Sequence, residues 1–183
     1  MAIKNKVTFE GDTFNMTKKD RLAAFTAFQG GGPQFAGFRG VVLSGGGTTT
    51  LTADDSGKVC IFDTAATSNF TLPAPKLGMK FTFIQTIINV ADHVIQTATD
   101  GHGFLGGVLI MNTTADQCNA FASDTDGSND FITLNATTTG GAAAGSRIEV
   151  VALSDTSGAG CWAVSGTLIG SGNTITPFGD AQL

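Results

Sequence analysis

The stretches KFTFIQTII (80–88) and RIEVVALS (147–154) decide the fold class, because apolar and polar residues alternate along both. In each of them two apolar residues enclose one polar residue: Phe81 and Phe83, and Ile148 and Val150. Side chains of a strand point alternately to opposite faces, so a period of two predicts a strand with one buried face and one solvated face. That pattern is typical of an antiparallel sheet with one wet face.

Short β-like runs continue through most of the chain after residue 40, and clusters of Gly, Asp, Ser and Pro separate them. Eight further strands are predicted at 41–43, 48–53, 58–62, 69–72, 93–98, 105–111, 131–137 and 161–169. Turn signals lie at 44–47, 54–57, 73–78, 99–103, 123–130 and 155–160. Strands and turns that follow each other at about every ten residues predict an all-β sandwich or barrel.

The first 40 residues differ from the rest in charge and in phenylalanine content. They hold six of the ten basic side chains, three acids and six of the fourteen phenylalanines, which gives a net charge of +3. The other 143 residues carry four basic and twelve acidic side chains, a net charge of −8. We therefore predict an N-terminal docking arm (1–40) and a body (41–183) with a C-terminal tail (167–183). An arm with this much apolar surface is too short to bury it and needs a partner.

A short helix is predicted in the arm at about residues 18–29. Thr17 can cap it, and Leu22, Phe25 and Phe28 lie on one of its faces. Three glycines at 30–32, followed by a proline, end the helix. A helix of about twelve residues is marginal alone, so we expect it to pack on the body or on another protein.

Composition disfavours several classes of protein. No run of about 18 apolar residues exists, so we expect no membrane span. The N-terminal sequence MAIKNKVTFEGD has charges where a signal peptide has its apolar core, so we expect no secretion. The overall charge of −5 argues against a nucleic-acid partner. Cys60, Cys118 and Cys161 are far apart and are expected to be small buried hydrophobic residues, in preference to a disulfide or a metal site.

The loop SDTDGSND (123–130) places Asp124, Asp126 and Asp130 around Gly127. Closely spaced carboxylates in a tight loop can bind calcium. The loop lacks the twelfth-position Glu and the flanking helices of an EF-hand, however, and Asp and Gly also make turns between strands. A structural turn is therefore the favoured interpretation, with an ion site as the alternative.

Nothing in the sequence indicates catalysis or a cofactor. His93 and His102 show no HxH or HExxH spacing, and no GxSxG motif accompanies them. Trp162 stands in an alternating segment, where packing in the core or between subunits is favoured over ligand stacking. We expect neither an enzyme nor a cofactor-binding protein.

Seven motifs follow one another between residues 51 and 166. They are LTADDSGKVCIFD (51–63), FTLPAP (70–75), GMKFTFI (78–84), DGHGFLGG (100–107), GSNDFITL (127–134), GSRIEVVALSD (145–155) and CWAVSG (161–166). In this order and spacing they resemble the β-domain of the tailed-phage capsid decoration, or cement, proteins. The resemblance covers about residues 48–166, and the arm lies outside it.

The resemblance implies a jelly-roll-like β-sandwich. Together with the residue patterns above, the expected fold is an antiparallel jelly-roll-like β-sandwich with an N-terminal extended arm that contains one short α-helix. The resemblance also implies a homotrimer on the exterior of the capsid of a virion, made in the host cytoplasm and bound to the major capsid protein. Such proteins clamp neighbouring capsid subunits, and no catalytic residues are carried over to this chain.

The role of the arm follows from its own chemistry. Apolar side chains can fill grooves between capsid subunits while basic ones pair with acidic rims. The residues expected to bind the capsid are Phe9, Phe14, Lys18, Lys19, Arg21, Leu22, Phe25 and Phe28. The alternative is a phage fibre or receptor-binding module that recognises host glycans. One Trp and no Tyr disfavour that alternative, because sugars stack on aromatic side chains.

Overall fold

The computed structural model describes residues 6–9, 12–15, 40–155 and 161–180. The chain divides into two compact units, Met1–Phe38 and Arg39–Leu183. In the first unit, β1 (Lys6–Phe9) and β2 (Asp12–Asn15) form an antiparallel pair. Phe9 and Phe14 belong to these strands. The predicted helix at 18–29 lies outside the described residues, and so do the other six candidate capsid-binding residues.

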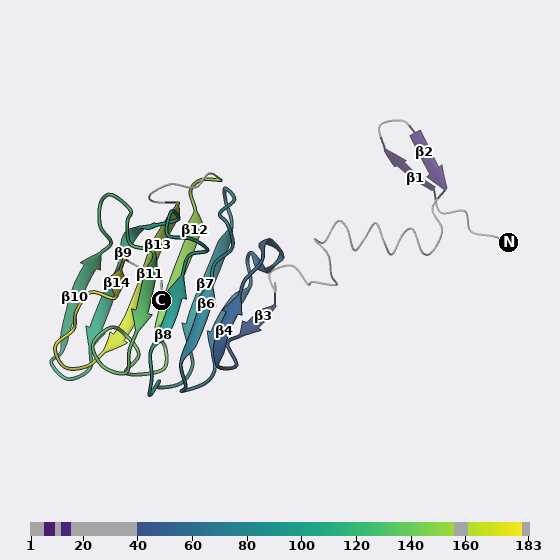
Figure 1. Cartoon of the computed structure of the whole chain (residues 1–183). Coiled ribbons are helices and arrows are strands. Elements are labelled where there is room, and N and C mark those ends of the chain that lie inside the picture. Colours follow the sequence, from purple (N-terminus) through teal and green to yellow (C-terminus); the bar gives the residue numbers. More distant parts are fainter. Residues whose placement is uncertain (1–5, 10–11, 16–39, 156–160, 181–183) are drawn as a thin grey trace. The chain divides into compact units, whose positions relative to one another are not determined.

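The second unit consists of two mixed β-sheets (Figure 1). The seven-stranded sheet contains, from edge to edge, β10 (Gln117–Ala122), β9 (Phe104–Asn112), β13 (Trp162–Gly170), β12 (Arg147–Ala152), β7 (Lys80–Gln85), β5 (Val59–Phe62) and β3 (Val41–Leu43). The five-stranded sheet contains β14 (Phe178–Gly179), β11 (Phe131–Leu134), β8 (His93–Gln96), β6 (Ser68–Thr71) and β4 (Gly47–Thr50). One 3-10 turn (η1, Ala53–Asp55) is the only helical element among the described residues. The prediction of an all-β fold is confirmed.

From β3 to β8 the chain passes alternately between the two sheets. Strands β3, β5 and β7 pair in parallel in one sheet, and strands β4, β6 and β8 pair in parallel in the other. This part of the chain therefore forms a two-sided coil in which each strand pairs with the strand two positions later. The second half is mostly antiparallel, with β9–β10 and β12–β13 as adjacent pairs. Strands β9 and β13 pair in parallel and so connect the β9–β10 pair to the β12–β13 pair within the sheet.

The prediction of a purely antiparallel arrangement is wrong, because both sheets are mixed. Alternation along a strand fixes which side chains share a face, and it does so equally in parallel and antiparallel sheets. The direction of the neighbouring strand depends instead on the connection. A turn that returns along the same sheet gives an antiparallel pair, whereas a turn that crosses to the facing sheet allows a parallel one.

Each of the ten predicted strands overlaps an observed strand of the second unit. Four observed strands were not predicted: β1 and β2 in the first unit, and β10 and β14 in the second. Strand β10 has the sequence QCNAFA, which shows no clear alternation, and β14 has only two residues. The segment 167–183, predicted as a tail, begins inside β13, which continues to Gly170. Phe178 and Gly179 of that segment pair with β11. No helix in the described part of the chain is long and apolar enough to cross a membrane.

The two sheets face each other across one hydrophobic core that contains side chains from both. Phe70 of β6 lies between the sheets, with its ring centroid 5.0 Å from that of Phe62 and 5.5 Å from that of Phe83. Trp162 is fully buried and packs against Phe81, with ring centroids 6.0 Å apart. The predicted packing role of Trp162 is therefore a role in the core of one chain.

The cysteines follow the prediction in two of three cases. Cys60 and Cys161 are buried, and burial raises the pKa of the Cys60 thiol to about 12. Cys118 is exposed, so the prediction that it is buried is wrong. Its strand, β10, is an edge strand of the seven-stranded sheet, and the side of β10 that carries Cys118 is not covered by the core.

The unexpected parallel pair of β9 and β13 can be tested at Gly106. This glycine has a φ of +126°, and a Cβ atom on it would lie 2.2 Å from the carbonyl oxygen of Val164 in β13. Gly172 also has a positive φ, +66°, but a Cβ atom there would meet no atom within 4 Å. We expect Gly172→Ala to lower the free energy of unfolding by about 1–2 kcal/mol and Gly106→Ala by clearly more, because of the added clash. Urea denaturation followed by Trp162 fluorescence measures both, and equal losses would contradict the β9–β13 pairing.

Candidate functional site

The loop 123–130 holds its shape through its own hydrogen bonds. The side-chain Oδ1 of Asn129 accepts from the backbone N–H of Asp124 at 2.7 Å, and Asn129 Nδ2 donates to Asp124 Oδ2 at 3.3 Å. The backbone N–H of Gly127 donates to the carbonyl oxygen of Asp124 at 3.1 Å. Asn129 is buried, and its amide joins the two ends of the turn. The favoured interpretation of this segment as a structural turn agrees with these bonds.

The Asp126 carboxylate also accepts a hydrogen bond within the loop. Its Oδ1 accepts from the backbone N–H of Ser128 at 3.1 Å, and this bond is the main cause that lowers the pKa of the Asp126 carboxyl. The structure therefore gives Asp124 and Asp126 partners inside the turn. It does not bring them together with Asp130 as one group of ligands.

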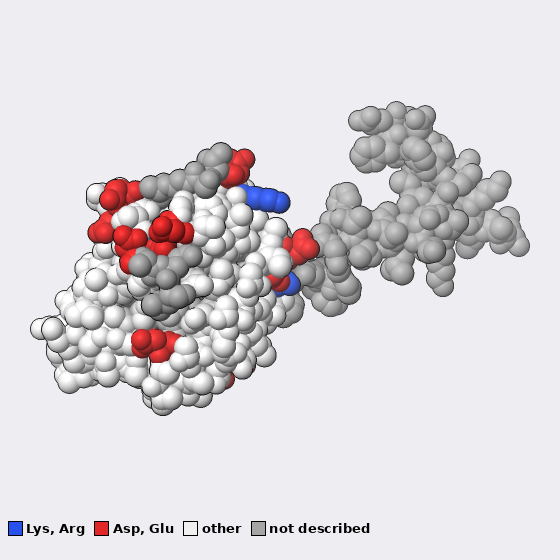
Figure 2. Space-filling view, in the orientation of Figure 1, with Lys and Arg blue, Asp and Glu red and all other residues white. Residues whose placement is uncertain are grey.

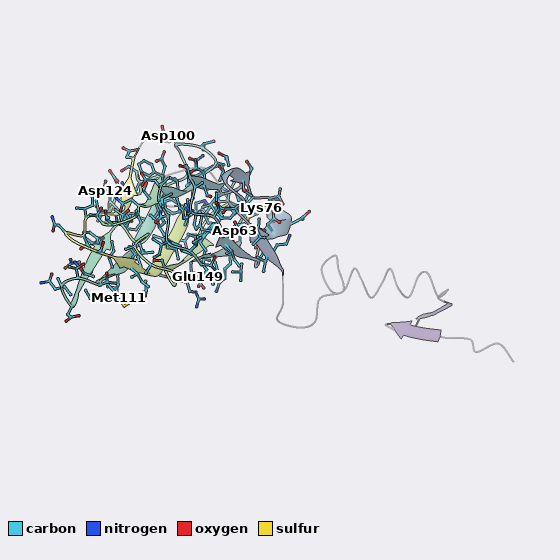
Figure 3. The ribbon with its side chains drawn as sticks, turned by 90° about the horizontal axis from the view of Figure 1, so that it is seen from below. Asp63, Lys76, Asp100, Met111, Asp124 and Glu149 are labelled. Atoms are coloured by element: carbon cyan, nitrogen blue, oxygen red, sulfur yellow. The ribbon has the colours of Figure 1, made fainter. Side chains whose placement is uncertain are left out.

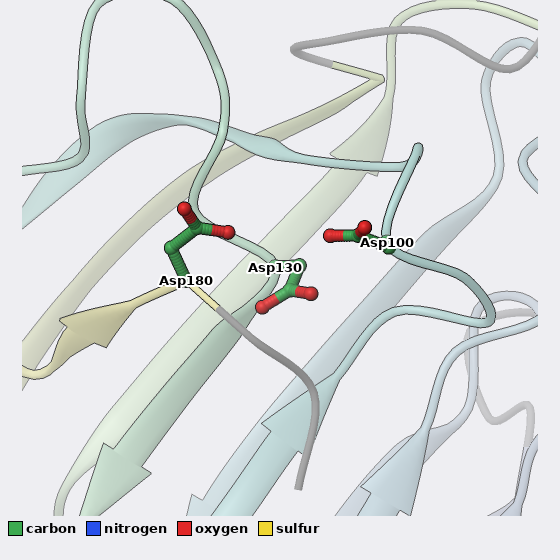
Figure 4. Close-up of side chains that lie close together, drawn as sticks. All are labelled: Asp100, Asp130 and Asp180. Atoms are coloured by element: carbon green, nitrogen blue, oxygen red, sulfur yellow. The ribbon is translucent and has the colours of Figure 1, made fainter.

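Asp130 instead meets Asp100 and Asp180 (Figure 4). One carboxylate oxygen from each of the three residues lies within 4.8 Å of the other two, and this is the only such group of three among the described residues. Asp130 is fully buried, whereas Asp100 and Asp180 are exposed. Asp100 comes from the turn after β8, Asp130 immediately precedes β11, and Asp180 immediately follows β14.

Backbone hydrogen bonds place Asp130 at this point. Its N–H donates to the carbonyl oxygen of Gly179 at 3.0 Å, and its carbonyl oxygen accepts from the N–H of Thr97 at 2.9 Å. Close packing of the neighbouring loops adds a second constraint. A Cβ atom on Gly103 would lie only 1.5 Å from the carbonyl oxygen of Gly127, so the turn 99–103 rests directly on the loop 123–130.

Three carboxylates are an oxygen donor set of the kind that calcium and magnesium use. Calcium takes about six to eight oxygen ligands. Backbone carbonyls and water would therefore have to complete its coordination shell. Sequence reasoning found one of the three residues, Asp130. It missed Asp100 and Asp180, because they are far from Asp130 along the chain and lie in turns that resemble many others.

The side chains of both histidines are buried in the body. The ring of His93 stacks on Phe62 with centroids 4.6 Å apart, and its Nε2 lies 3.0 Å from the Thr64 carbonyl oxygen and 3.2 Å from that of Ala66. Because both partners are acceptors, Nε2 carries the proton and donates it. Burial lowers the pKa of His93, against the opposing effect of the two carbonyls, and burial also lowers the pKa of His102.

Charge is unevenly distributed over the body. Most acidic side chains visible in Figure 2 gather toward one end, where the turns and loops lie, and most of the remaining visible body surface has no charge. Figure 3 shows Met111 and Glu149 on one side of the body and Asp100 on the opposite side. The three-aspartate cluster therefore lies away from the outward surface of β9 and β12.

Comparison with known proteins found no match. No family model, no curated protein and no solved structure is detectably similar to the chain. The resemblance to the capsid decoration proteins thus rests on the order of short motifs alone.

The role of Asn129 can be tested by Asn129→Ala. We expect this substitution to lower the free energy of unfolding by about 1–3 kcal/mol, because it leaves buried polar groups at the ends of the turn without their partner. Thr125→Ala changes an exposed residue of the same loop and should stay within about 0.5 kcal/mol of the wild type. Both values come from urea denaturation, and equal values for the two variants would refute the role of Asn129.

The histidines give the stability of the protein a defined dependence on pH. Their pKa values lie below the ordinary value of 6.5 in the folded chain, so below that pH the unfolded chain binds more protons. We expect the free energy of unfolding to be fully retained above about pH 6.5 and to fall as the pH drops through the folded-state pKa values. His93→Gln should make the loss between about pH 7 and pH 5 smaller. Denaturation at each pH measures this, and an unchanged pH dependence in the variant would contradict it.

Proposed function

We propose that this chain is a virion structural protein: a decoration protein that binds the outer surface of a tailed-phage head and stabilises contacts between major capsid protein subunits. The observation that carries the proposal is the ordered run of seven motifs over about residues 48–166. The motifs occupy turns and strands throughout the body, including η1 with β5, then β7 and β12. The partner would be the major capsid protein, with the decoration protein present as a homotrimer.

The jelly-roll fold belongs to the same proposal. Two facing sheets around one core support it. The parallel pairs β3–β5 and β4–β6 depart from a jelly roll, in which neighbouring strands are antiparallel. The proposed fold is therefore a jelly-roll-like body whose first half is wound as a parallel coil.

The arm supports the proposed mode of binding through its composition. Its net charge of +3 and its six phenylalanines combine electrostatic attraction with apolar anchors. Contacts repeated over a shell add up through avidity, so each copy requires only a modest interface. The arm would grip either capsid subunits or sister copies of this chain.

A non-enzymatic role is part of the proposal. His93 donates to backbone carbonyls, and the carboxylates of Asp124 and Asp126 accept hydrogen bonds within their own loop. These side chains thus have structural partners. They do not form a pair of nucleophile and base in a cleft.

Glycan recognition is not proposed, because the described body offers no aromatic platform. Among residues 40–155 and 161–180, every Phe and Trp side chain is buried or half-buried. Trp162, the one tryptophan of the chain, is fully buried in the core.

Capsid binding can be tested by co-sedimentation with assembled tailed-phage heads that lack their own decoration protein. We expect the full chain to sediment with a matching head type, and a variant without residues 1–31 to remain in solution. Trp162 fluorescence verifies that the truncated protein keeps its buried tryptophan environment.

A point variant of the full chain tests the electrostatic contribution of the arm. Arg21→Glu should weaken binding and make it less sensitive to salt, because it removes an attractive charge. Lys76→Glu makes the same change of charge at an exposed position of the body and serves as the matched control. If the truncated protein occupied heads as fully as the full chain does, the arm would not be the capsid-binding element.

A further inference from the structure

The outer face of the seven-stranded sheet, defined as the side chains of its strands that point away from the core, is unusually apolar. One register row crosses the whole sheet, from β10 to β3. It runs Ala120, Leu109, Thr167, Arg147, Ile84, Ile61 and Leu43. Five of these seven side chains are aliphatic. Leu43 and Leu109, near the two ends of the row, are 56% and 47% exposed.

The part of the five-stranded sheet formed by β4 and β6 shows the opposite character on its outward side. Thr48, Thr50, Asn69 and Thr71 point away from the core there, since Phe70 between them points inward. Gln96 of β8 donates to Thr71 Oγ1 on the same side, at 3.1 Å. One outer face of the body is thus suited to water, whereas the other resembles a sheet face that is normally covered.

Charges on the outer face are few, and they form ion pairs with one another. No aspartate of the body lies in a strand, so the eleven aspartates of residues 41–183 are all outside this face. The face has three charged side chains, and they lie next to one another. Lys80 Nζ is 2.9 Å from Glu149 Oε1, and Arg147 Nη2 is 3.6 Å from Glu149 Oε2. Two copies of this strongly acidic body can therefore meet on this face without bringing aspartates together.

The outer face also has two depressions that side chains of a partner can fill. Gly166 lies in the floor of a depression of about 480 Å³ between Arg147 and Thr167. A second depression of about 420 Å³ lies where Gly106 and Gly107 leave β9 without side chains beside β10. Aliphatic side chains stand beside these hollows, so the face offers both projections and recesses.

We infer that the outer face of the seven-stranded sheet is an interface with a second copy of this chain. Seven strands about 4.8 Å apart, with about six residues each at 3.3 Å, give a face of roughly 670 Å². A stable protein interface buries about 600–1,000 Å² per partner, so the face is large enough for a dimer contact. The absence of aspartates from this face permits a second acidic copy to approach it, and its aliphatic side chains distinguish it from the polar side chains on the outward side of the five-stranded sheet.

Edge strand β10 extends the same surface. Its sequence, QCNAFA, contains neither a charged residue nor a proline, the usual means by which an exposed edge avoids pairing. Cys118, Ala120 and Ala122 of β10 share the outward side with Leu109 and Met111 of β9. Self-association through the outer face does not depend on capsid binding.

The experiment uses the full chain and measures its mass in solution by sedimentation equilibrium over a range of concentrations. We expect a mass of at least twice the 18.6 kDa chain, falling toward one chain on dilution. Leu43→Glu and Leu109→Glu each place a charge at one end of the face and should weaken the association constant at least about tenfold. Thr48→Glu adds the same charge to the polar outer face and should leave the mass unchanged.

Cys118 gives a second readout within the wild-type protein. It lies on the proposed interface and is exposed, whereas Cys60 and Cys161 are buried, so a thiol reagent added to the folded chain reports on Cys118. Its rate of modification should fall as the protein concentration rises, and the rate should stay high at all concentrations in Leu43→Glu.

The outcomes separate clearly. A wild-type protein that remains one chain at high concentration overturns the inference. An assembly that resists both leucine substitutions, or that Thr48→Glu dissociates equally, also overturns it, as does a Cys118 rate that is independent of concentration. A wild-type protein that remains one chain would also contradict the proposed homotrimer. Binding to phage heads is decided separately by the co-sedimentation assay, so failure of the interface and failure of capsid binding are distinguishable.

Discussion

The contact of Phe70 with Phe62 and Phe83 is the interaction on which the two-layer body depends. Phe70 belongs to the five-stranded sheet, and its two partners belong to neighbouring strands of the seven-stranded sheet. His93 extends the ring cluster by stacking on Phe62. Because successive strands of the first half lie in opposite sheets, these rings connect windings of the coil as well as the two layers. Buried aromatic side chains of this size contribute more to stability than any other single contacts in the body.

That core leaves the body with three different surfaces. The turns at one end carry most of the acidic groups, the outward side of the five-stranded sheet is rich in threonine, and the outward side of the seven-stranded sheet is aliphatic. The seven-stranded sheet is thus largely apolar on both faces, and a sheet of this kind is normally covered on both sides. The proposed capsid attachment through the basic arm and the proposed self-association through the aliphatic face are compatible, because they use different parts of the chain.

The sequence was sufficient to predict most of the strands but not their partners. Alternation at Phe81 and Phe83 identifies the buried face of β7 in any sheet, but it does not distinguish the parallel neighbour β5 from an antiparallel one. Strand β10 escaped prediction because pairing with β9, and not a hydrophobic pattern, holds it in the sheet. For the acidic loop, proximity in sequence was misleading. The backbone bonds of Asp130 to Gly179 and Thr97 turn it away from Asp124, toward two residues that only the fold brings near.

The strand order also has a consequence for how the protein forms during synthesis. Strands β3 to β8 are contiguous in the chain and pair among themselves, so this part of both sheets can assemble before the rest has left the ribosome. Strands β9 and β10 pair next with each other, but nothing yet joins them to β7. Only β12 and β13, near the C-terminus, fill the gap between β7 and β9. The seven-stranded sheet is therefore completed only when this pair of strands is inserted at its centre, and a nascent chain exposes two apolar sheet edges until that step.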